Sequence, residues 1–360
     1  MRPSMFFTDV VLCPRDRHNS ETSEALMTTI LTRETQSRSA PIQRIAPLQV
    51  VVTALTVAAY VFTNSGFAAQ KSAGTIGLSV LTMNNPFFKE IADSMTAEAA
   101  KHGYSVVAVS GDFDVARQQN QVKDFIVRKV SAIVLCPCDS TAIGPAIREA
   151  NKAGIPVFTA DIASLDTTAK VVAHIATDNL QGGRMAAEAV VEAIGGQGKV
   201  AILDHPEVES VLLRTRGFEE KLAELNQQSG VKVQVVAKLP GGGDKARSFK
   251  AAQDLIQAHA DLNAIFAVND PSALGARAAL ENAGKAGQIK IVGFDGQPEG
   301  KQAIKDGKLY ADPIQYPDKI GAEAVRAFIK YMNGEDVPKQ VLIPTALYRK
   351  ADAAKDPSLK

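Results

Sequence analysis

From residue 75 onward, short apolar runs alternate with segments of helical periodicity. In segment 87–101, apolar side chains recur at three- and four-residue spacing, from Phe88 to Ile91, Met95 and Ala99, which predicts an amphipathic helix. The runs themselves are continuously apolar rather than alternating, which is typical of strands buried on both faces of a parallel sheet. The expected strands are 75–81, 104–109, 131–136, 156–160, 171–175, 199–203, 232–237, 264–268, 290–294 and 310–314.

The strand and helix rhythm predicts an α/β fold. About a dozen strands exceed one compact sheet of this kind, so we expect two doubly wound lobes, each built on a parallel sheet. The expected helices are 87–101, 115–129, 142–152, 184–194, 214–225, 245–258, 272–283 and 321–331.

Residues 1–69 follow a different pattern. Segment 45–70 carries no charge, and within it residues 50–62 form a strongly apolar run that is preceded by arginines and followed by small residues. A helix of this length spans about 20 Å, which is short of the roughly 30 Å core of a bilayer. A basic segment, a short apolar core and small residues before the cleavage site are typical of a secretory signal peptide.

We therefore predict cleavage after Ala68 or Ala69 and export to the periplasm. An uncleaved membrane anchor is the alternative. The leader is long for a signal peptide, so Met27 is a second hypothesis for the start of the chain.

The composition excludes some kinds of partner and of stabilisation but does not indicate a function. The chain has 360 residues, a mass of 38.2 kDa, a net charge of +1 and a sequence pI near 7.7, so charge implies no polyanionic partner and disfavours nucleic-acid binding. Three cysteines cannot stabilise a chain of this size by disulfides. Cys136 and Cys138 could form a strained disulfide or a soft-metal site, or be two structural thiols.

Polar side chains and a phenylalanine pair follow several of the expected strands. In doubly wound folds, ligands bind beyond the carboxyl ends of the strands. Amides and carboxylates pair with sugar hydroxyls, and aromatic faces cover the C–H face of a sugar ring. Each residue also has a simpler interpretation, because Asn85 could cap a helix and Asp161 or Asp295 could belong to a turn. The residues that follow strands are Asn85, Phe87, Phe88, Asp161, Asn269, Asp295 and Gln315.

Residues 75–344 resemble the ribose-binding-type periplasmic proteins, which are the sugar-binding components of ABC importers. The resemblance is specific as a set of motifs rather than through any one of them. The motifs are TMNNPFFKEI (82–91), IVLCPCD (133–139), IPVFTAD (155–161), HIATDNLQGG (174–183), RTRGF (214–218), AIFAVND (264–270), ALGA (273–276), IVGFDG (291–296) and IQYPDKIGAEAV (314–325).

The resemblance implies a ligand site between two lobes. The first lobe would comprise residues 74–175 and 316–344, and the second 176–315 and 345–360, with three crossovers forming a hinge. We expect 351–360 to be a frayed tail. The implied ligand contacts are Asn85, Phe87, Phe88 and Asp161 from the first lobe, and Arg214, Asn269, Asp295 and Gln315 from the second lobe and hinge.

Three departures from the ribose-type pattern concern the ligand. Ribose-binding members carry Arg where Ile162 stands and Ser where Leu81 stands, and they place an aromatic residue near the segment 241–244, which here reads GGGD. Loss of the arginine removes charged donors, and loss of the aromatic removes half of a stacking pair. The fold and the transport role are therefore expected, but ribose as the ligand is not.

The sequence thus predicts an exported, monomeric, non-enzymatic protein that captures a sugar or polyol between two lobes. It would deliver the ligand to an ABC permease with its ATPase, and would contact the membrane only through that permease. The alternative is a receptor subunit for a chemoreceptor or sensor kinase. We expect no cofactor and no metal, because the sequence contains no acid/base dyad with a nucleophile and no spaced set of metal ligands.

Overall fold

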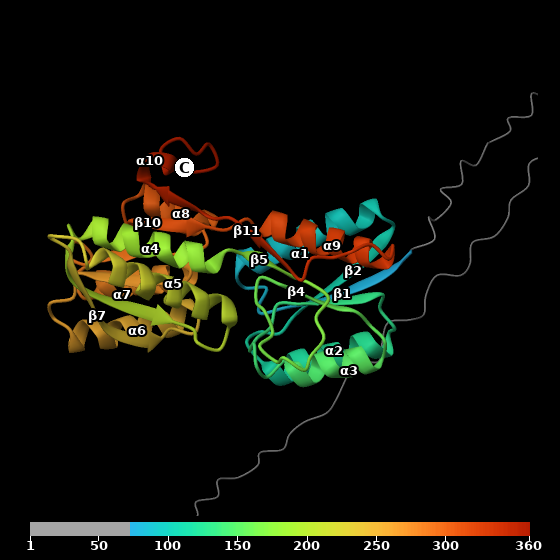
Figure 1. The fold of residues 1–360 in the computed structure, drawn as a ribbon. Coiled ribbons are helices and arrows are strands. Elements are labelled where there is room, and N and C mark those ends of the chain that lie inside the picture. The colour runs from blue at the N-terminus through green and yellow to red at the C-terminus, as the bar shows by residue number, and fades with distance from the viewer. Residues whose placement is uncertain (1–72) are drawn as a thin grey trace, which may run out of the picture. The chain divides into compact units, whose positions relative to one another are not determined.

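A computed structural model describes residues 73–360 as two six-stranded sheets, each covered by helices on both faces (Figure 1). The prediction of two doubly wound α/β lobes is confirmed. The signal peptide and its apolar core at 50–62 lie outside the described residues.

The sheet of the first lobe is parallel throughout. Helices α1 (Pro86–Lys101) and α9 (Pro317–Met332) cover one face, and α2 (Val115–Val127) and α3 (Gly144–Lys152) cover the other (Figure 1). The strand order is β11 (Gln340–Ile343), β5 (His174–Thr177), β4 (Val157–Ala160), β3 (Ala132–Leu135), β1 (Gly74–Val80) and β2 (Tyr104–Ser110).

The sheet of the second lobe is parallel except for one edge strand, β12, which runs antiparallel to its neighbour. The strand order is β12 (Ala346–Arg349), β10 (Ala311–Ile314), β9 (Lys290–Val292), β8 (Ala264–Ala267), β6 (Gln197–Asp204) and β7 (Lys232–Pro240). The helices are α4 (Asn179–Ala193), α5 (Glu209–Leu225), α6 (Lys245–Ala258), α7 (Asp270–Asn282), α8 (Pro298–Lys305) and α10 (Lys350–Ala353).

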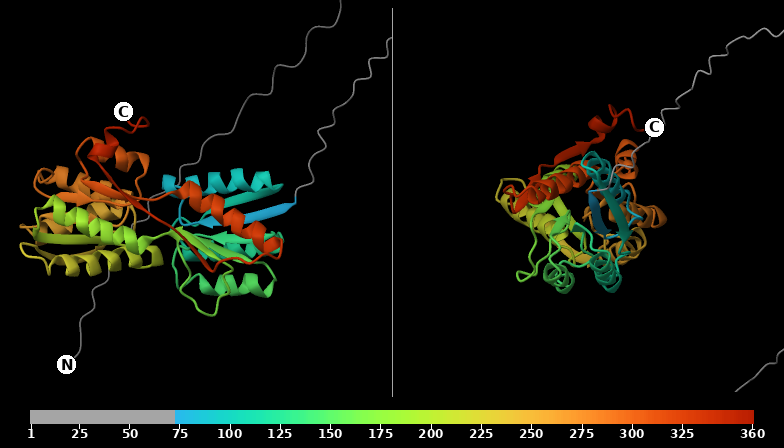
Figure 2. Two further views of the ribbon diagram at one scale, coloured as in Figure 1. Left: turned by 45° about the horizontal axis from the view of Figure 1, so that its top comes forward. Right: turned by 90° about the vertical axis from the view of Figure 1, so that its right-hand side faces the viewer.

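The chain passes between the two sheets three times: after β5, after β10 and after β11. Figure 2 shows the last of these passages as the extended segment that leads from β11 to β12. Side chains connect the passages, because the Thr177 hydroxyl donates to Gln315 Oε1 at 2.6 Å and the backbone N–H of Thr345 donates to Gln181 Oε1 at 3.0 Å. Segments far apart in sequence are thereby joined where the lobes meet.

Helices α4 and α5 begin five residues earlier than the sequence pattern predicts, at Asn179 and Glu209 instead of 184 and 214. The first turns of α4 contain Gly182 and Gly183, which disfavour a helix locally. Tertiary packing overrides this preference, because a Cβ on Gly183 would lie 2.0 Å from the carbonyl oxygen of Arg214. Glycine thus permits the two helices to pack backbone against backbone, and this contact sets the position of Arg214.

Other differences concern short elements and the C-terminus. The strand expected at 171–175 is His174–Thr177, where it pairs with β11 and β4. The pattern did not predict α8, α10, β11 or β12, which are short. The prediction of a frayed tail is wrong, because Ala353 is fully buried and the backbone N–H of Lys360 donates to Gln302 Oε1 at 3.1 Å.

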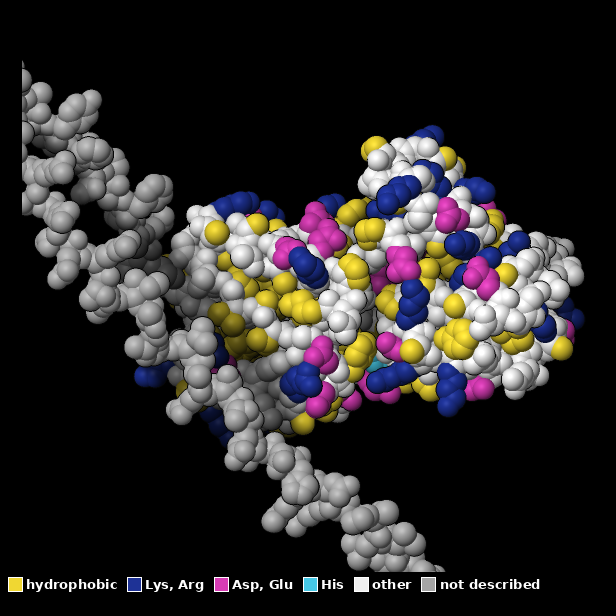
Figure 3. All heavy atoms as spheres, turned by 180° about the vertical axis from the view of Figure 1, so that it is seen from behind, with side chains coloured by type: hydrophobic (Ala, Val, Ile, Leu, Met, Phe, Trp, Pro, Cys, Tyr) yellow, Lys and Arg dark blue, Asp and Glu magenta, His cyan; other side chains and the backbone are white. Residues whose placement is uncertain are grey.

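Lysine, arginine and acidic side chains are intermixed over the face shown in Figure 3. Within residues 73–360, no helix is both long and apolar enough to cross a membrane.

Candidate ligand-binding site

All eight predicted contact residues lie around one cavity. Its walls come from strand ends and helix starts of both lobes and from Gln315 in the hinge. The cavity measures about 30 Å³, far below the roughly 300–1000 Å³ of typical small-molecule pockets. A second cavity of about 390 Å³ shares Thr82, Asn85, Phe113 and Gly243 with it. The space between the lobes therefore continues beyond Gly243.

The first lobe contributes an aromatic wall. Asn85 caps α1, since its Oδ1 accepts the backbone N–H of Phe87 at 3.0 Å. This cap and Pro86 at the first helical position start the helix after the short segment 81–85 that follows β1. The rings of Phe87 and Phe88 pack edge to face with centroids 5.2 Å apart. Asn85 thus both caps the helix and lines the cavity, so its two interpretations are compatible.

Asp161 is the one acidic side chain that the first lobe places in the cavity wall. It directly follows β4, has a φ of 64°, and is 3% exposed. Its Oδ1 atom is buried without a hydrogen-bond partner among the described residues. Burial raises the pKa of Asp161 to about 7, although Arg214 lowers it. The site therefore contains a buried carboxyl oxygen, Asp161 Oδ1, that is free to accept a hydrogen bond.

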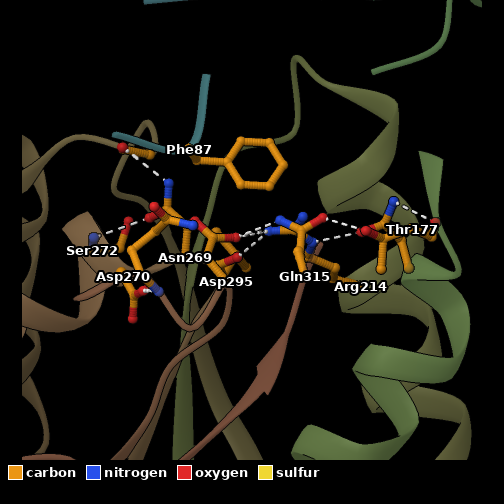
Figure 4. Close-up of polar contacts among 12 residues, drawn as sticks. Phe87, Thr177, Arg214, Asn269, Asp270, Ser272, Asp295 and Gln315 are labelled. Atoms are coloured by element: carbon orange, nitrogen blue, oxygen red, sulfur yellow. Dashed lines mark hydrogen bonds and ion pairs between the residues drawn. The ribbon is translucent and has the colours of Figure 1, made fainter. Parts of the chain in front are cut away.

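Arg214 on α5 is the centre of a polar network in the second lobe (Figure 4). Its guanidinium donates to Asn179 Oδ1 and to the carbonyl of Val268, both at 2.8 Å, and to Asp295 Oδ1 at 3.1 Å. It also stacks on the ring of Phe294, with 3.8 Å between Cζ and the ring centroid. These contacts fix a buried cation with a single orientation toward the cavity.

Asp295 and Gln315 extend this network to the hinge. Gln315 Nε2 donates to Asp295 Oδ1 at 2.6 Å, and Gln315 Oε1 accepts the Thr177 hydroxyl. Asp295 is 2% exposed and has a φ of 100°. Burial raises its pKa despite the lowering effects of Arg214 and Gln315. In Figure 4 the Phe87 ring lies opposite the row formed by Asn269, Asp295 and Gln315.

Asn269 caps α7 in the same way that Asn85 caps α1. Its Oδ1 accepts the backbone N–H of Ser272 at 3.0 Å, and its Nδ2 donates to the carbonyl of Gly243 at 3.1 Å. Gly243 has a φ of 64°, and a Cβ there would lie 3.0 Å from His205 Nδ1. The loop at 241–243, which lacks the expected aromatic, is therefore closely packed against the site.

Sequence reasoning missed Phe113 and His205, which also line the cavity. Phe113 follows β2, His205 directly follows β6, and their ring centroids are 6.1 Å apart. Burial lowers the pKa of His205, so its imidazole is neutral near pH 7. The rule that ligand residues follow strands, if applied to β2 and β6, would have found both of them.

The lobes touch each other beside the cavity. The backbone N–H of Ser140 in the first lobe donates to the carbonyl of Glu207 in the second at 2.9 Å. The Ser140 hydroxyl accepts the backbone N–H of Glu209, also at 2.9 Å. Ser140 is fully buried by this arrangement. The small cavity and these contacts together indicate that the lobes are closed over the site.

Cys136 and Cys138 are buried free thiols. Burial raises the pKa of Cys136 well above its ordinary value and that of Cys138 to about 12, so neither forms a reactive thiolate near neutral pH. Among residues 73–360, no cluster of His, Cys, Asp and Glu is arranged to hold a metal ion.

Residues 76–336 match the model of the periplasmic binding protein domain. The chain belongs to this family. It is 38% identical over 291 residues to the ribose import binding protein RbsB of Salmonella typhimurium, which covers 81% of this chain and 94% of that protein. The predicted membership in the periplasmic sugar-binding proteins of ABC importers is confirmed.

Two further relatives differ in the ligand that they are named for. The chain is 31% identical over 297 residues to the D-apiose import binding protein of Paraburkholderia graminis, covering 82% of this chain and 92% of that one. A solved ABC transporter solute-binding protein from Agrobacterium vitis with bound D-fucose has a TM-score of 0.72 and 30% identity, covering 79% of this chain and 98% of that chain. The family thus accommodates different sugars on one fold.

Proposed function

We propose that this protein captures a sugar or sugar-like polyol between its lobes and delivers it to the permease of an ABC importer. The observation that carries the proposal is a single cavity whose lining includes all eight predicted polar and aromatic contact residues, from both lobes and the hinge. The relatives named above are import binding proteins, which favours a permease rather than a chemoreceptor as the partner.

The cavity offers the chemistry that a sugar requires. Asp161 Oδ1 has no hydrogen-bond partner among the described residues, so it can accept a ligand hydroxyl. The second lobe presents Arg214, Asn269 and Asp295 in orientations fixed by their own hydrogen bonds. The Phe87 ring opposite them covers the apolar face of a sugar ring.

Ligand entry requires the lobes to separate, because the cavity is only about 30 Å³ and Ser140 bridges the lobes beside it. Closure around the ligand is a hinge movement. We propose that the closed pair of lobes is the surface that the permease recognises, with the protein acting as a monomer.

The cavity departs from the ribose-type pattern at one residue in particular, and this residue bears on the ligand. Ile162 is 1% exposed and lines the cavity beside Asp161. An isoleucine donates no hydrogen bond, so a ligand hydroxyl facing it remains unsatisfied. We propose that the ligand presents a deoxy carbon, a methyl group or a C–H face to Ile162.

Export by the predicted signal peptide is part of the same proposal. Sequencing of the mature N-terminus is expected to show cleavage after Ala68 or Ala69, with the protein in the periplasmic fraction. Recovery of the uncleaved chain in the cytoplasm would contradict it.

A thermal-shift screen of the mature protein against pentoses, hexoses, deoxysugars and polyols tests ligand capture. A ligand at about 100 times its Kd adds roughly 2.7 kcal/mol to the free energy of unfolding. Small-angle scattering with and without the best ligand then tests closure, which is expected to lower the radius of gyration. The absence of any stabilising sugar would contradict the proposed function.

A further inference from the structure

Phe113 reaches from the first lobe to the second beside the ligand cavity. It lies between β2 and α2, and its ring centroid is 6.1 Å from that of His205, which follows β6. The guanidinium of Arg247 on α6 lies over the same ring, with 5.6 Å between Cζ and the ring centroid, which is within the range of a cation–π contact. One first-lobe ring thus contacts two second-lobe side chains, and these contacts are lost when the lobes separate.

The backbone holds Phe113 in an unusual conformation. Its φ is 61° and that of Asp112 is 52°, in a left-handed region that bulky residues rarely adopt. Neighbouring groups fix the turn. The backbone N–H of Phe113 donates to the carbonyl of Leu81 at 3.2 Å, and the Asp112 carboxylate accepts from the Ser110 hydroxyl and the Arg117 guanidinium. Such a conformation persists only where the surrounding structure enforces it, so the ring is held at one place at the edge of the first lobe.

Glycine lies across the cleft from this ring. Gly243 lines the same cavity as Phe113, and a Cβ on it would lie 3.0 Å from His205 Nδ1 and 3.2 Å from Asn269 Nδ2. The second lobe therefore presents only backbone at this point, and the apolar surface comes from Phe113.

Phe113 lies on the boundary between the ligand cavity and the larger cavity beside it, which we call the outer cavity. The ligand cavity measures about 30 Å³ and the outer cavity about 390 Å³. Thr82 and Asn85 use their side-chain oxygens to accept backbone N–H groups of their own loop, and Gly243 has no side chain. Phe113 is therefore the one bulky apolar side chain on the boundary. The residues that line both cavities are Thr82, Asn85, Phe113 and Gly243.

The outer cavity has room for a ligand substituent. Its volume falls within the roughly 300–1000 Å³ of typical small-molecule pockets. Gln297 also lines it, is 5% exposed, and has a side-chain oxygen without a partner among the described residues. A group that extended from the ligand past the Phe113 ring would enter this cavity. Its apolar lining consists of Pro86, Phe113, Pro271, Leu274 and Pro298.

We propose that Phe113 is a specificity-determining residue: its ring separates the ligand cavity from the outer cavity in the closed protein and restricts the ligand to an unsubstituted monosaccharide or polyol. The proposal rests on the proposed function, because it concerns the size of the sugar that the same site accepts. A substituent that points toward Phe113 would displace the ring from His205 and Arg247 and prevent closure. Removal of the ring would join the two cavities.

Calorimetry tests the size limit with D-ribose, D-allose, D-fucose, D-apiose and myo-inositol as probes. The mono-O-methyl derivatives of the best of these probes follow, one for each hydroxyl group. Wild type is expected to bind every derivative at least about tenfold more weakly than the parent sugar, because a closely packed site does not accommodate an added methyl group. In F113G, the derivative whose methyl group enters the outer cavity is expected to bind at least about fivefold better, relative to the parent sugar, than in wild type.

Two further variants separate loss of the ring from a change in the backbone. Glycine adopts a φ of 61° without strain, so F113G is expected to fold. F113A keeps a Cβ at the same φ and is expected to show the same change in ligand preference. The matched control is F113Y, which keeps the ring and is expected to retain the wild-type ratios within about threefold. The parent sugar is expected to bind about 2–10-fold more weakly to F113G and F113A, because its aromatic contact is lost.

Fluorescence tests the contact between the lobes separately. The chain contains no tryptophan, so F113W carries a single indole at this position. Saturating parent sugar is expected to change its emission, because closure brings His205 and Arg247 against the ring. V127W is the control, since Val127 is 79% exposed at the other end of α2; its emission is expected to stay unchanged.

Either of two results would overturn the proposal while the proposed function stands. One is discrimination against every derivative by F113G and F113A that is as strong as in wild type. The other is an F113W emission that sugar leaves unchanged although small-angle scattering shows closure. A folded wild-type protein that binds none of the probes would instead contradict the proposed function, and the size limit with it.

Discussion

The two lobes prepare their halves of the ligand site differently. In the second lobe and hinge, Arg214, Asp295 and Gln315 are connected by hydrogen bonds of 2.6–3.1 Å that exist without ligand. In the first lobe, Phe87 and Phe88 form an apolar wall, and the Asp161 carboxyl beside it has an unpartnered buried oxygen. The second-lobe groups already have hydrogen-bond partners before a ligand binds, whereas Asp161 in the first lobe has a buried oxygen without one.

Because of this difference, substitutions in the two lobes are expected to affect the free energy of unfolding and the ligand affinity differently. A buried ion pair that loses one partner leaves an uncompensated charge in the folded protein. A buried carboxyl without a partner already disfavours folding, so its removal carries little penalty until a ligand is present. Substitutions in the second-lobe network are therefore expected to reduce both stability and binding, and substitutions at Asp161 are expected to reduce binding alone.

The largest effect is expected for Arg214→Ala. Loss of the guanidinium leaves Asp295 unpaired, so the free energy of unfolding is expected to fall by about 3–5 kcal/mol. Urea denaturation measures the loss. Arg216→Ala is the matched control, because Arg216 lies on the same helix, pairs with Glu220 and has a side chain that is 61% exposed; its effect is expected to stay within about 0.5 kcal/mol. Equal free energies of unfolding for the two variants would contradict the proposed difference between the lobes.

Asp161→Asn is expected to weaken sugar binding by about 5–150-fold, since a ligand hydroxyl loses a charged acceptor. Its free energy of unfolding is expected to improve relative to wild type as the pH rises from about 4 to about 7, because the pKa of Asp161 in the folded protein is raised to about 7. Denaturation at pH 5 and pH 8, with calorimetry on the best ligand, measures both effects. Asp295→Asn serves as the comparison and should lose stability as well as affinity.

Ile162→Arg tests the first-lobe side of the site, because it adds hydrogen-bond donors where the wild-type side chain has none. The ratio of affinities for D-ribose over 2-deoxy-D-ribose is expected to rise by about 5–150-fold, corresponding to about 1–3 kcal/mol for one satisfied hydroxyl. Wild-type protein is expected to bind D-ribose with a Kd above about 100 μM, and Ile162→Val should leave the ratio unchanged. Submicromolar binding of D-ribose by wild type, measured by calorimetry, would refute the argument.

The smallest effect is expected for Ser140→Ala, which removes a hydrogen bond between the lobes but no contact with the ligand. A net loss of about 0.5–1.5 kcal/mol from the closed state corresponds to about 2–10-fold in affinity. Ser105→Ala, at an exposed serine whose hydroxyl bonds Thr75 within the first lobe, is the control. If Ser140→Ala changes neither the affinity nor the radius of gyration without ligand, the bridge does not contribute to closure.

Much of the site followed from the sequence because it depends on a local rule. Asn85, Asp161, Asn269 and Asp295 each lie at or just past the end of an apolar strand, and in a parallel sheet those ends meet at one edge. Arg214 does not follow a strand, and it was identified only through the resemblance to a known family. Its place depends on the packing of α4 against α5.

The sequence by itself determined the two α/β lobes, the order of most strands and helices, and several of the polar residues that line the cavity, because hydrophobic periodicity and strand-end position are local properties. Tertiary structure alone decided which polar groups are already paired and which are not. Asp161 and Asp295 look alike in the sequence, since each follows an apolar run. In the fold, Asp295 contacts Arg214 and Gln315, whereas Asp161 keeps an unpartnered oxygen. Such pairings depend on distances between segments far apart along the chain, and neither composition nor periodicity contains those distances.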